Sequence, residues 1–244
     1  MTELREPADH KGADTDGSVA DAFVAELRER ATIYWEKHPF QQAMLAGELG
    51  PAEIRGFVAN RWYYQKWLPQ KDAAVIANCP VPEVRRRWVE RIAYHDGPHD
   101  GSGGLADWLL LCDAVGLERA EVLDERHVLP AVRFAVDRYV QFARTASWVE
   151  GVASSLTELF APDLMSKRIA AFRTYYPWID PAGLAYFERR CVQAPREASH
   201  ALDVVLAHAT TAEQRAGCAA ALTLKCQVLW AILDALDHTF RDTR

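Results

Sequence analysis

The sequence lacks the usual features of secreted, membrane-spanning and nucleic-acid-binding proteins. Its five cysteines are odd in number and contain no Cys-x-x-Cys pair, which predicts reduced, buried thiols. No apolar run approaches the length of a membrane span, and the polar first residues lack the apolar core of a signal peptide. Because the net charge is −6, nucleic acid and anionic membranes are not the expected partners. We therefore expect a cytoplasmic protein with no nucleic-acid or membrane partner.

Several motifs that mark common chemistries are also missing. The chain has no Gly-x-Ser-x-Gly nucleophile motif, no P-loop and no Gly-x-Gly-x-x-Gly after a strand. No histidine belongs to the Glu-x-x-His motif of di-iron bundles. His95 and His99 are separated by Gly97 and Pro98, which interrupt a helix, so their side chains need not share a face. The sequence therefore predicts no metal site.

Sustained two-residue alternation, the pattern of a half-buried strand, does not occur, whereas three-to-four-residue periodicity recurs along most of the chain. We predict a disordered tail over 1–18 and a single all-α domain, a compact helical bundle, over 19–244. The predicted helices lie near 19–36, 51–68, 70–78, 82–96, 105–116, 129–147, 149–159, 181–194 and 212–240, with shorter ones near 41–47, 162–174 and 199–209.

The predicted helix over 51–68 carries polar groups on the face that should be buried. Arg61 and Gln65 fall in the middle of that face at 100° per residue. Its apolar members are Ile54, Phe57, Val58, Tyr64 and Leu68. An unpaired arginine or amide in such a position costs several kcal/mol, so a neighbouring helix or a ligand must supply partners.

Other predicted helices repeat this arrangement. Their inward faces include Arg91, His95, Tyr139, Tyr186, Arg190 and Lys225. Taken singly, such a residue is usually paired or reaches solvent with its polar end. Taken together they are unbalanced, because the only inward-facing acids that periodicity suggests are Asp234 and Glu158. Since like charges repel in a low dielectric, we predict that a small polyanion binds between the helices.

Long segments of the chain resemble the PqqC family, the pyrroloquinoline quinone (PQQ) synthases. The matching segments are ANRWYYQ (59–65), KDAAVIANCP (71–80), RRRWVERIAYHDG (85–97), ERHVLPAVRFAVD (125–137), SSLTELFAP (154–162) and YYPWI (175–179). The resemblance implies a haem oxygenase-like bundle related to the TenA proteins, and a homodimer. It also implies an oxidase without a cofactor, which closes a ring and oxidises a tricarboxylated quinoline-type precursor to PQQ with dioxygen, releasing hydrogen peroxide.

The resemblance also implies roles for individual residues. Matching positions in the family contact the substrate; here they are Tyr34, Arg61, Tyr64, Gln65, Arg91, Glu158 and Arg168. His95 matches the proposed general base, and Tyr139 matches a proton donor or positioning group. Tyr186 and Arg190 match the oxygen-handling centre, where Lys225 would help to stabilise reduced oxygen.

The chain departs from the family pattern at two positions, and from the pattern of related di-iron oxidases in one run of ligand positions. The family has histidines where this chain has Trp35 and Met165. Related di-iron oxidases have a His-x3-Asp-x2-His run where this chain has Tyr186, Arg190 and Gln193, which cannot hold iron. The departures leave three alternatives: a PQQ synthase that tolerates both changes, an oxidase of this type for a different small anionic substrate, or a PQQ-binding homologue without catalytic activity.

Overall fold

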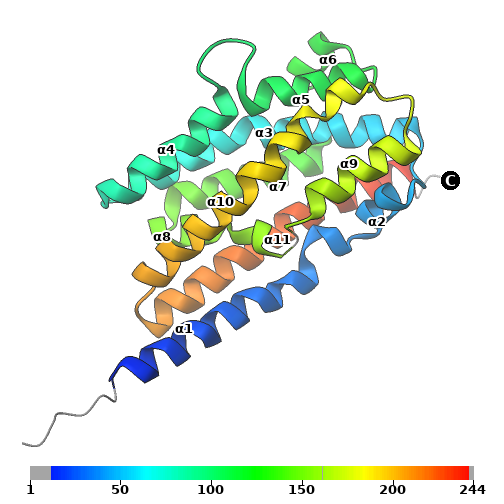
Figure 1. Ribbon diagram of the computed structural model, residues 1–244. Coiled ribbons are helices and arrows are strands. Elements are labelled where there is room, and N and C mark those ends of the chain that lie inside the picture. Colours follow the sequence, from blue (N-terminus) through cyan, green and yellow to red (C-terminus); the bar gives the residue numbers. More distant parts are fainter. Residues whose placement is uncertain (1–11, 161, 242–244) are drawn as a thin grey trace, which may run out of the picture.

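Helices are the only regular secondary structure in the residues that the computed structural model describes, which are 12–160 and 162–241, without the side chains of 12–16 and Glu158. The all-α prediction is therefore confirmed (Figure 1). The elements are α1 (Gly12–Glu29), η1 (Arg30–Ile33), η2 (Trp35–Lys37), α2 (Pro39–Ala46), α3 (Pro51–Asn78), α4 (Pro82–Asp96), α5 (Gly103–Ala114), α6 (Arg119–Leu123), α7 (Pro130–Thr145), α8 (Trp148–Ala153), η3 (Leu156–Leu159), α9 (Leu164–Tyr175), η4 (Pro181–Leu184), α10 (Ala185–His208) and α11 (Ala212–Phe240).

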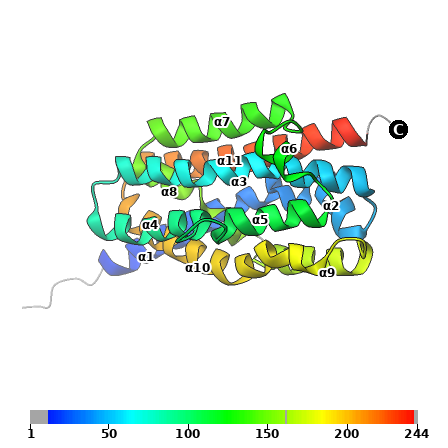
Figure 2. The same cartoon turned by 90° about the horizontal axis from the view of Figure 1, so that it is seen from above.

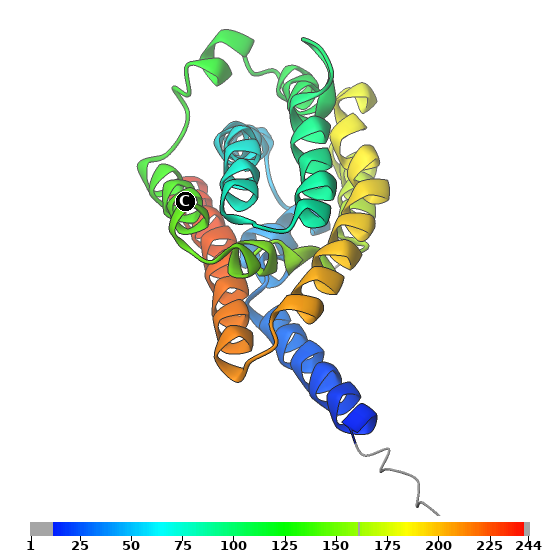
Figure 3. The same ribbon diagram turned by 90° about the vertical axis from the view of Figure 1, so that its left-hand side faces the viewer.

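Helix α3 runs through the middle of the bundle. It packs against α4, α5, α7, α8 and α11, and in Figure 3, which looks along the helices, they surround it. Every residue over 56–65 is buried, so this stretch has no solvent-facing side. The helix begins with Pro51 at its first turn, where the missing N–H costs nothing.

The prediction of two helices over 51–68 and 70–78 is wrong, because α3 continues through Pro69. A proline inside a helix removes one hydrogen bond and costs about 3 kcal/mol, and here packing on all sides outweighs that cost. The continuous helix places Lys71 in the same helical stripe as Arg61, Tyr64 and Leu68, each three to four residues after the one before.

Helix α10 likewise continues through Pro195 and joins the predicted helices near 181–194 and 199–209. At the N-terminus, α1 starts at Gly12, so 12–18 are helical where a disordered tail was predicted; 1–11 lie outside the described residues. α1 projects away from the other helices in Figures 1 and 3 and is anchored by the buried side chains of Phe23 and Leu27.

The expectation that no apolar run approaches the length of a membrane span was wrong for helix α11. By length and composition it could cross a membrane, with a window of mean hydropathy 1.6. However, 56% of that window is buried, and the helix packs against α7, α8 and α3. Its start is fixed by a capping box, because the side chains of Thr211 and Gln214 each accept a hydrogen bond from the other's backbone N–H. α11 is therefore a core helix of the bundle.

The helices lie roughly side by side along one direction, with α7 and α9/α10 at opposite edges when seen from above (Figure 2). Their apolar faces form two clusters of buried side chains. One contains Phe57, Trp108 and Leu233, and the other contains Trp88 and Leu222. The polar side chains discussed below come from α3, α4, α7, α9, α10 and α11 and meet inside this bundle.

Candidate active site

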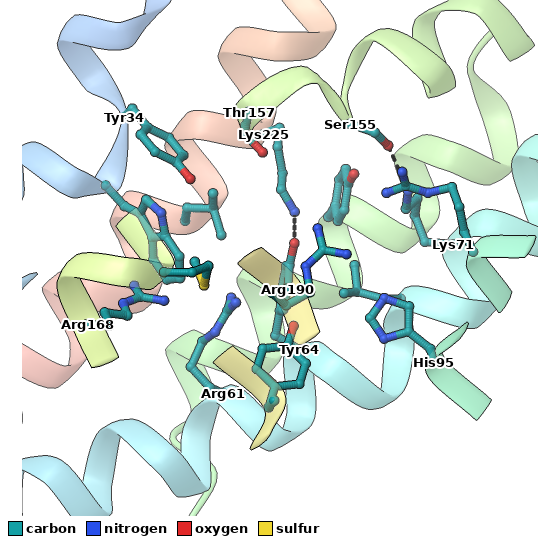
Figure 4. A pocket seen from close by; sticks show the side chains of 17 residues that line it. Tyr34, Arg61, Tyr64, Lys71, His95, Ser155, Thr157, Arg168, Arg190 and Lys225 are labelled. Carbon is teal, nitrogen blue, oxygen red and sulfur yellow. Dashed lines mark hydrogen bonds between the residues drawn. The ribbon is translucent and has the colours of Figure 1, made fainter. Parts of the chain in front are cut away.

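A cavity inside the bundle gathers polar side chains from helices far apart in the sequence (Figure 4). It has an empty volume of about 610 Å³, part of it open to solvent. Its cationic lining residues are Arg61, Lys71, Arg91, Arg168, Arg190 and Lys225. No aspartate or glutamate of the described residues lines this cavity. The lining also includes Tyr34, Trp35, Tyr64, His95, Tyr139, Ser155, Thr157, Met165 and Tyr186.

The cavity has two ends of different character. In Figure 4, Arg61 and Arg168 lie at the end beside Tyr34, whereas His95 and Lys71 lie at the opposite end. Lys225 lies between these ends. A ligand that spans the cavity would therefore meet two arginines at one end and an imidazole at the other.

His95 is placed in the last turn of α4 by the glycine that ends the helix. Gly97 has φ +76° and donates its N–H to the carbonyl of Ala93, and a side chain there would collide with the backbone of Ser102. Burial, and after it the charge of Arg190, lower the pKa of His95 to about 3, against the opposing effects of nearby carboxylates. The imidazole is therefore neutral at pH 7, and its Nδ1 has no hydrogen-bond partner among the described residues.

The carboxylate of Asp72 balances part of the positive charge around His95. It accepts hydrogen bonds from Lys71 Nζ at 2.5 Å and from Trp88 Nε1 at 2.9 Å, and it lies 3.5 Å from Arg91 Nε. Burial alone would raise the pKa of Asp72, but Lys71 and Arg91 lower it below its usual range. Asp72 is thus a buried carboxylate that holds two of the cavity's cations in place.

Glu197 on α10 is the second such carboxylate. Its Oε2 lies 2.9 Å from Arg91 Nη1 and 2.9 Å from Arg190 Nη1, so one oxygen joins two helices. Burial would raise the pKa of Glu197, but Arg91 and Arg190 lower it. Arg91 and Arg190 therefore face the cavity with a carboxylate behind them.

Arg61 and Arg168 differ because aromatic rings are their main neighbours. The guanidinium carbon of each lies 4.4 Å from the centroid of the Trp35 ring, and Arg61 also lies 4.1 Å from the Tyr64 ring. Burial, and after it the charge of Arg61, lower the pKa of Arg168 to about 9. Because both guanidinium carbons lie 4.4 Å from one ring centroid, they are at most about 9 Å apart. Two like charges at that distance repel by roughly 2 kcal/mol at an effective dielectric of 20. This end of the cavity therefore favours an anion.

Lys225 is held between two tyrosines. Its Nζ donates a hydrogen bond to Tyr64 Oη and lies 4.0 Å from the centroid of the Tyr139 ring. The Tyr139 hydroxyl in turn lies 3.1 Å from Ser154 Oγ. Lys225 is 3% exposed, so its charge acts on the cavity with little screening by water.

Most of the site residues predicted from sequence line this cavity; Gln65, Glu158 and the predicted inward-facing Asp234 need separate comment. Gln65 is fully buried outside the lining, and its amide atoms have no hydrogen-bond partner among the described residues. The side chain of Glu158 lies outside the part that the structure describes. Asp234, expected to face inward, is 63% exposed and contacts His38 at 3.0 Å.

Sequence reasoning missed Lys71, Asp72 and Glu197. Lys71 follows Arg61, Tyr64 and Leu68 at helical spacing. It was not assigned to their face because the helix was predicted to end before Pro69. Glu197 lies seven residues, or two helical turns, after Arg190 and so on the same face of the helix. It was not identified because the helix was predicted to end at 194. The expectation of few inward-facing acids was therefore wrong, although no described acid lines the cavity itself.

The arrangement of helices defines the class of protein. A solved domain with a haem oxygenase-like fold from Shewanella denitrificans superposes with a TM-score of 0.72 at 15% identity and covers 97% of this chain and 95% of its own. A TenA homologue from Pseudomonas syringae superposes with a TM-score of 0.69 at 13% identity and covers 96% and 99%. The bundle therefore has the haem oxygenase-like fold that was predicted.

The family follows from the sequence comparisons. The model of the TENA/THI-4/PQQC family matches 24–235, and the chain belongs to this family. The pyrroloquinoline-quinone synthase of Pseudomonas aeruginosa is 49% identical over 218 residues, which cover 89% of this chain and 87% of the relative. The enzyme of the same name from Klebsiella pneumoniae is 46% identical over 226 residues, which cover 93% and 90%. These matches confirm the family resemblance predicted from the sequence.

Proposed function

We propose that this protein is an oxidase of the pyrroloquinoline-quinone synthase type. It would catalyse the final ring closure and the dioxygen-dependent oxidation of a tricarboxylated quinoline precursor to PQQ. The carrying observation is the cavity with six cationic side chains and no described acid in its lining. A ligand with three carboxylates supplies the negative charge that this cavity lacks. The same activity is supported by the relatives named pyrroloquinoline-quinone synthase, which are 46–49% identical over 89–93% of this chain.

In this proposal His95 removes a carbon-bound proton from the substrate. A neutral imidazole can accept a proton, and a negatively charged substrate beside it would raise its low pKa towards neutrality. Tyr139 would donate or position a proton. The resulting electron-rich ring then passes two electrons and two protons to one dioxygen, which leaves as hydrogen peroxide in each oxidation step. Arg190 and Lys225 would stabilise the negative charge that forms on reduced oxygen.

The proposal also includes the oligomeric state, the cellular location, the co-substrate and the role of Tyr186. We expect a homodimer in the cytoplasm, with dioxygen as co-substrate and no cofactor, as the family resemblance implies. Tyr186 would belong to the oxygen-handling centre; its ring packs edge to face against Trp108 at 4.9 Å, which fixes its position next to Arg190 in the cavity wall.

A second candidate is an oxidase of this family for a different small anion. It is favoured by Trp35 and Met165, which depart from the family pattern and both line the cavity. A bulky indole and a thioether, which carries no transferable proton, change the shape and the proton-transfer groups of the site. A PQQ-binding homologue without catalysis is the third reading, and the same experiment separates it from the others.

The test is anaerobic mixing with the PQQ precursor, followed by admission of dioxygen. We expect an absorbance change before oxygen is admitted, and afterwards PQQ and hydrogen peroxide in a fixed ratio. The matched variant His95→Ala should bind the precursor but not convert it. No spectral change with the precursor would support a different substrate. Binding of PQQ without any conversion of the precursor would support the non-catalytic reading and overturn the proposal.

A further inference from the structure

The indole ring of Trp35 contacts two guanidinium groups from different helices. The Cζ atoms of Arg61 on α3 and Arg168 on α9 each lie 4.4 Å from its centroid, so they are no further apart than twice that distance. Trp35 is 2% exposed, so water does not screen these charges. Tryptophan attracts cations more strongly than the other aromatic side chains, because its ring face is the most negative. One ring therefore stabilises two cations that repel each other.

Trp35 and the two arginines that it contacts carry four buried donor atoms without a protein partner. Trp35 Nε1, Nε and Nη1 of Arg61, and Nε of Arg168 have no hydrogen-bond partner among the described residues. Arg168 Nη2 donates to Gln41 Oε1, which fixes the orientation of its guanidinium. Buried donors without partners are rare in native structures, and these four belong to three side chains that line the same end of one cavity. A ligand group with several acceptor oxygens and a negative charge would satisfy them together.

We infer that Trp35 is a specificity-determining residue, and that with Arg61 and Arg168 it forms a subsite for one carboxylate of an aromatic acid. Its ring keeps the two arginines charged and in place, and its Nε1 donates a third hydrogen bond to the carboxylate. This inference rests on the proposed function, because it assigns one carboxylate of the polyanionic ligand to this end of the cavity.

The chemistry of the side chain explains why it suits this position. A carboxylate residue in its place would neutralise the arginines and compete with the ligand. An aliphatic residue would leave two buried cations facing each other without compensation. The indole attracts both cations without neutralising them, so their donors remain available to a ligand. Arg91 and Arg190, by contrast, already share a protein carboxylate.

The test compares PQQ with its trimethyl ester, which has the same rings but no carboxylate charge. Equilibrium dissociation constants are measured by calorimetry for wild type, Trp35→Phe and Trp35→Leu. Trp35→Phe keeps a ring face and loses the N–H, and Trp35→Leu loses both. We expect the Kd for PQQ to rise about 10-fold in Trp35→Phe and about 100-fold in Trp35→Leu, whereas the Kd for the ester changes less than about 3-fold. The control Trp62→Phe removes another buried, unpartnered indole N–H, outside the cavity lining, and should change neither constant.

The outcomes separate this inference from the proposed function. Equal losses of affinity for PQQ and for the ester would show that Trp35 only fills space and would overturn the inference, as would unchanged affinity for both. If Trp35→Leu does not fold, as judged by its thermal melt, Trp35→Phe decides alone. Wild type that binds PQQ with the expected preference but does not convert the precursor would overturn the proposed function and support the subsite. Wild type that binds PQQ no better than the ester would overturn the subsite.

Discussion

Neutralising Glu197 should lower the stability of the protein and raise its affinity for a polyanion. Its Oε2 lies 2.9 Å from both Arg91 Nη1 and Arg190 Nη1, and its side chain is 12% exposed. Glu197→Gln keeps the shape and one acceptor oxygen but turns two charge-assisted hydrogen bonds into weaker ones. At about 1 kcal/mol lost per bond, the free energy of unfolding should fall by about 2 kcal/mol. For a chain of this size that corresponds to a decrease in Tm of about 4–8 °C.

The same substitution removes a negative charge from behind two arginines that line the cavity. A ligand carboxylate about 6 Å away, at an effective dielectric of 20, would then be bound more strongly by roughly 2–3 kcal/mol. Calorimetry with PQQ should therefore show binding that is about 30- to 150-fold tighter. Glu188→Gln is the matched control, because Glu188 is also on α10 and pairs with Arg173 at 2.8 Å on the surface. Weaker binding by Glu197→Gln would refute the reasoning and show that this carboxylate mainly positions the arginines.

His95 should make stability depend on pH. Because its pKa in the folded state is lowered to about 3, only the unfolded chain takes up its proton below about pH 6.5, so the free energy of unfolding should fall by up to about 1.4 kcal/mol per unit as pH drops towards 3. Urea unfolding at pH 7 and pH 5 should show this slope in wild type and a smaller one in His95→Gln; equal slopes would contradict the assignment. Lys71→Met leaves the fully buried Asp72 with one partner fewer and should cost about 3 kcal/mol in chemical denaturation; a loss below about 1 kcal/mol would contradict the pairing. Tyr139→Phe loses only the hydroxyl contact to Ser154, so it should bind PQQ as wild type does but convert the precursor more slowly; unchanged turnover would rule out a proton-transfer role.

The fold and many residues of the candidate site could be predicted because both leave a periodic signal in the sequence. Arg61 on α3 and His95 on α4 interrupt apolar faces at helical spacing, and such interruptions show that a polar residue faces inward. Family resemblance added Arg168 and Trp35, which periodicity alone did not identify. The helix ends at Pro69 and Pro195 were predicted wrongly, because the local cost of a proline is outweighed by packing that only the folded chain supplies.

The pairing of charges could not be predicted, because it depends on how distant helices meet. Lys71 and Asp72 are neighbours in sequence, yet Asp72 also contacts Arg91 and Trp88 on α4, and Glu197 joins α4 to α10. Each of these carboxylates contacts cations from behind the cavity wall, so those cations keep one side for a ligand. At the other end, the ring of Trp35 contacts Arg61 and Arg168, and neither arginine forms an ion pair with a carboxylate of the described residues. The cations of the cavity wall are therefore held by two different means: carboxylates contact those near His95, whereas near Trp35 the buried arginine donors have no carboxylate partner among the described residues.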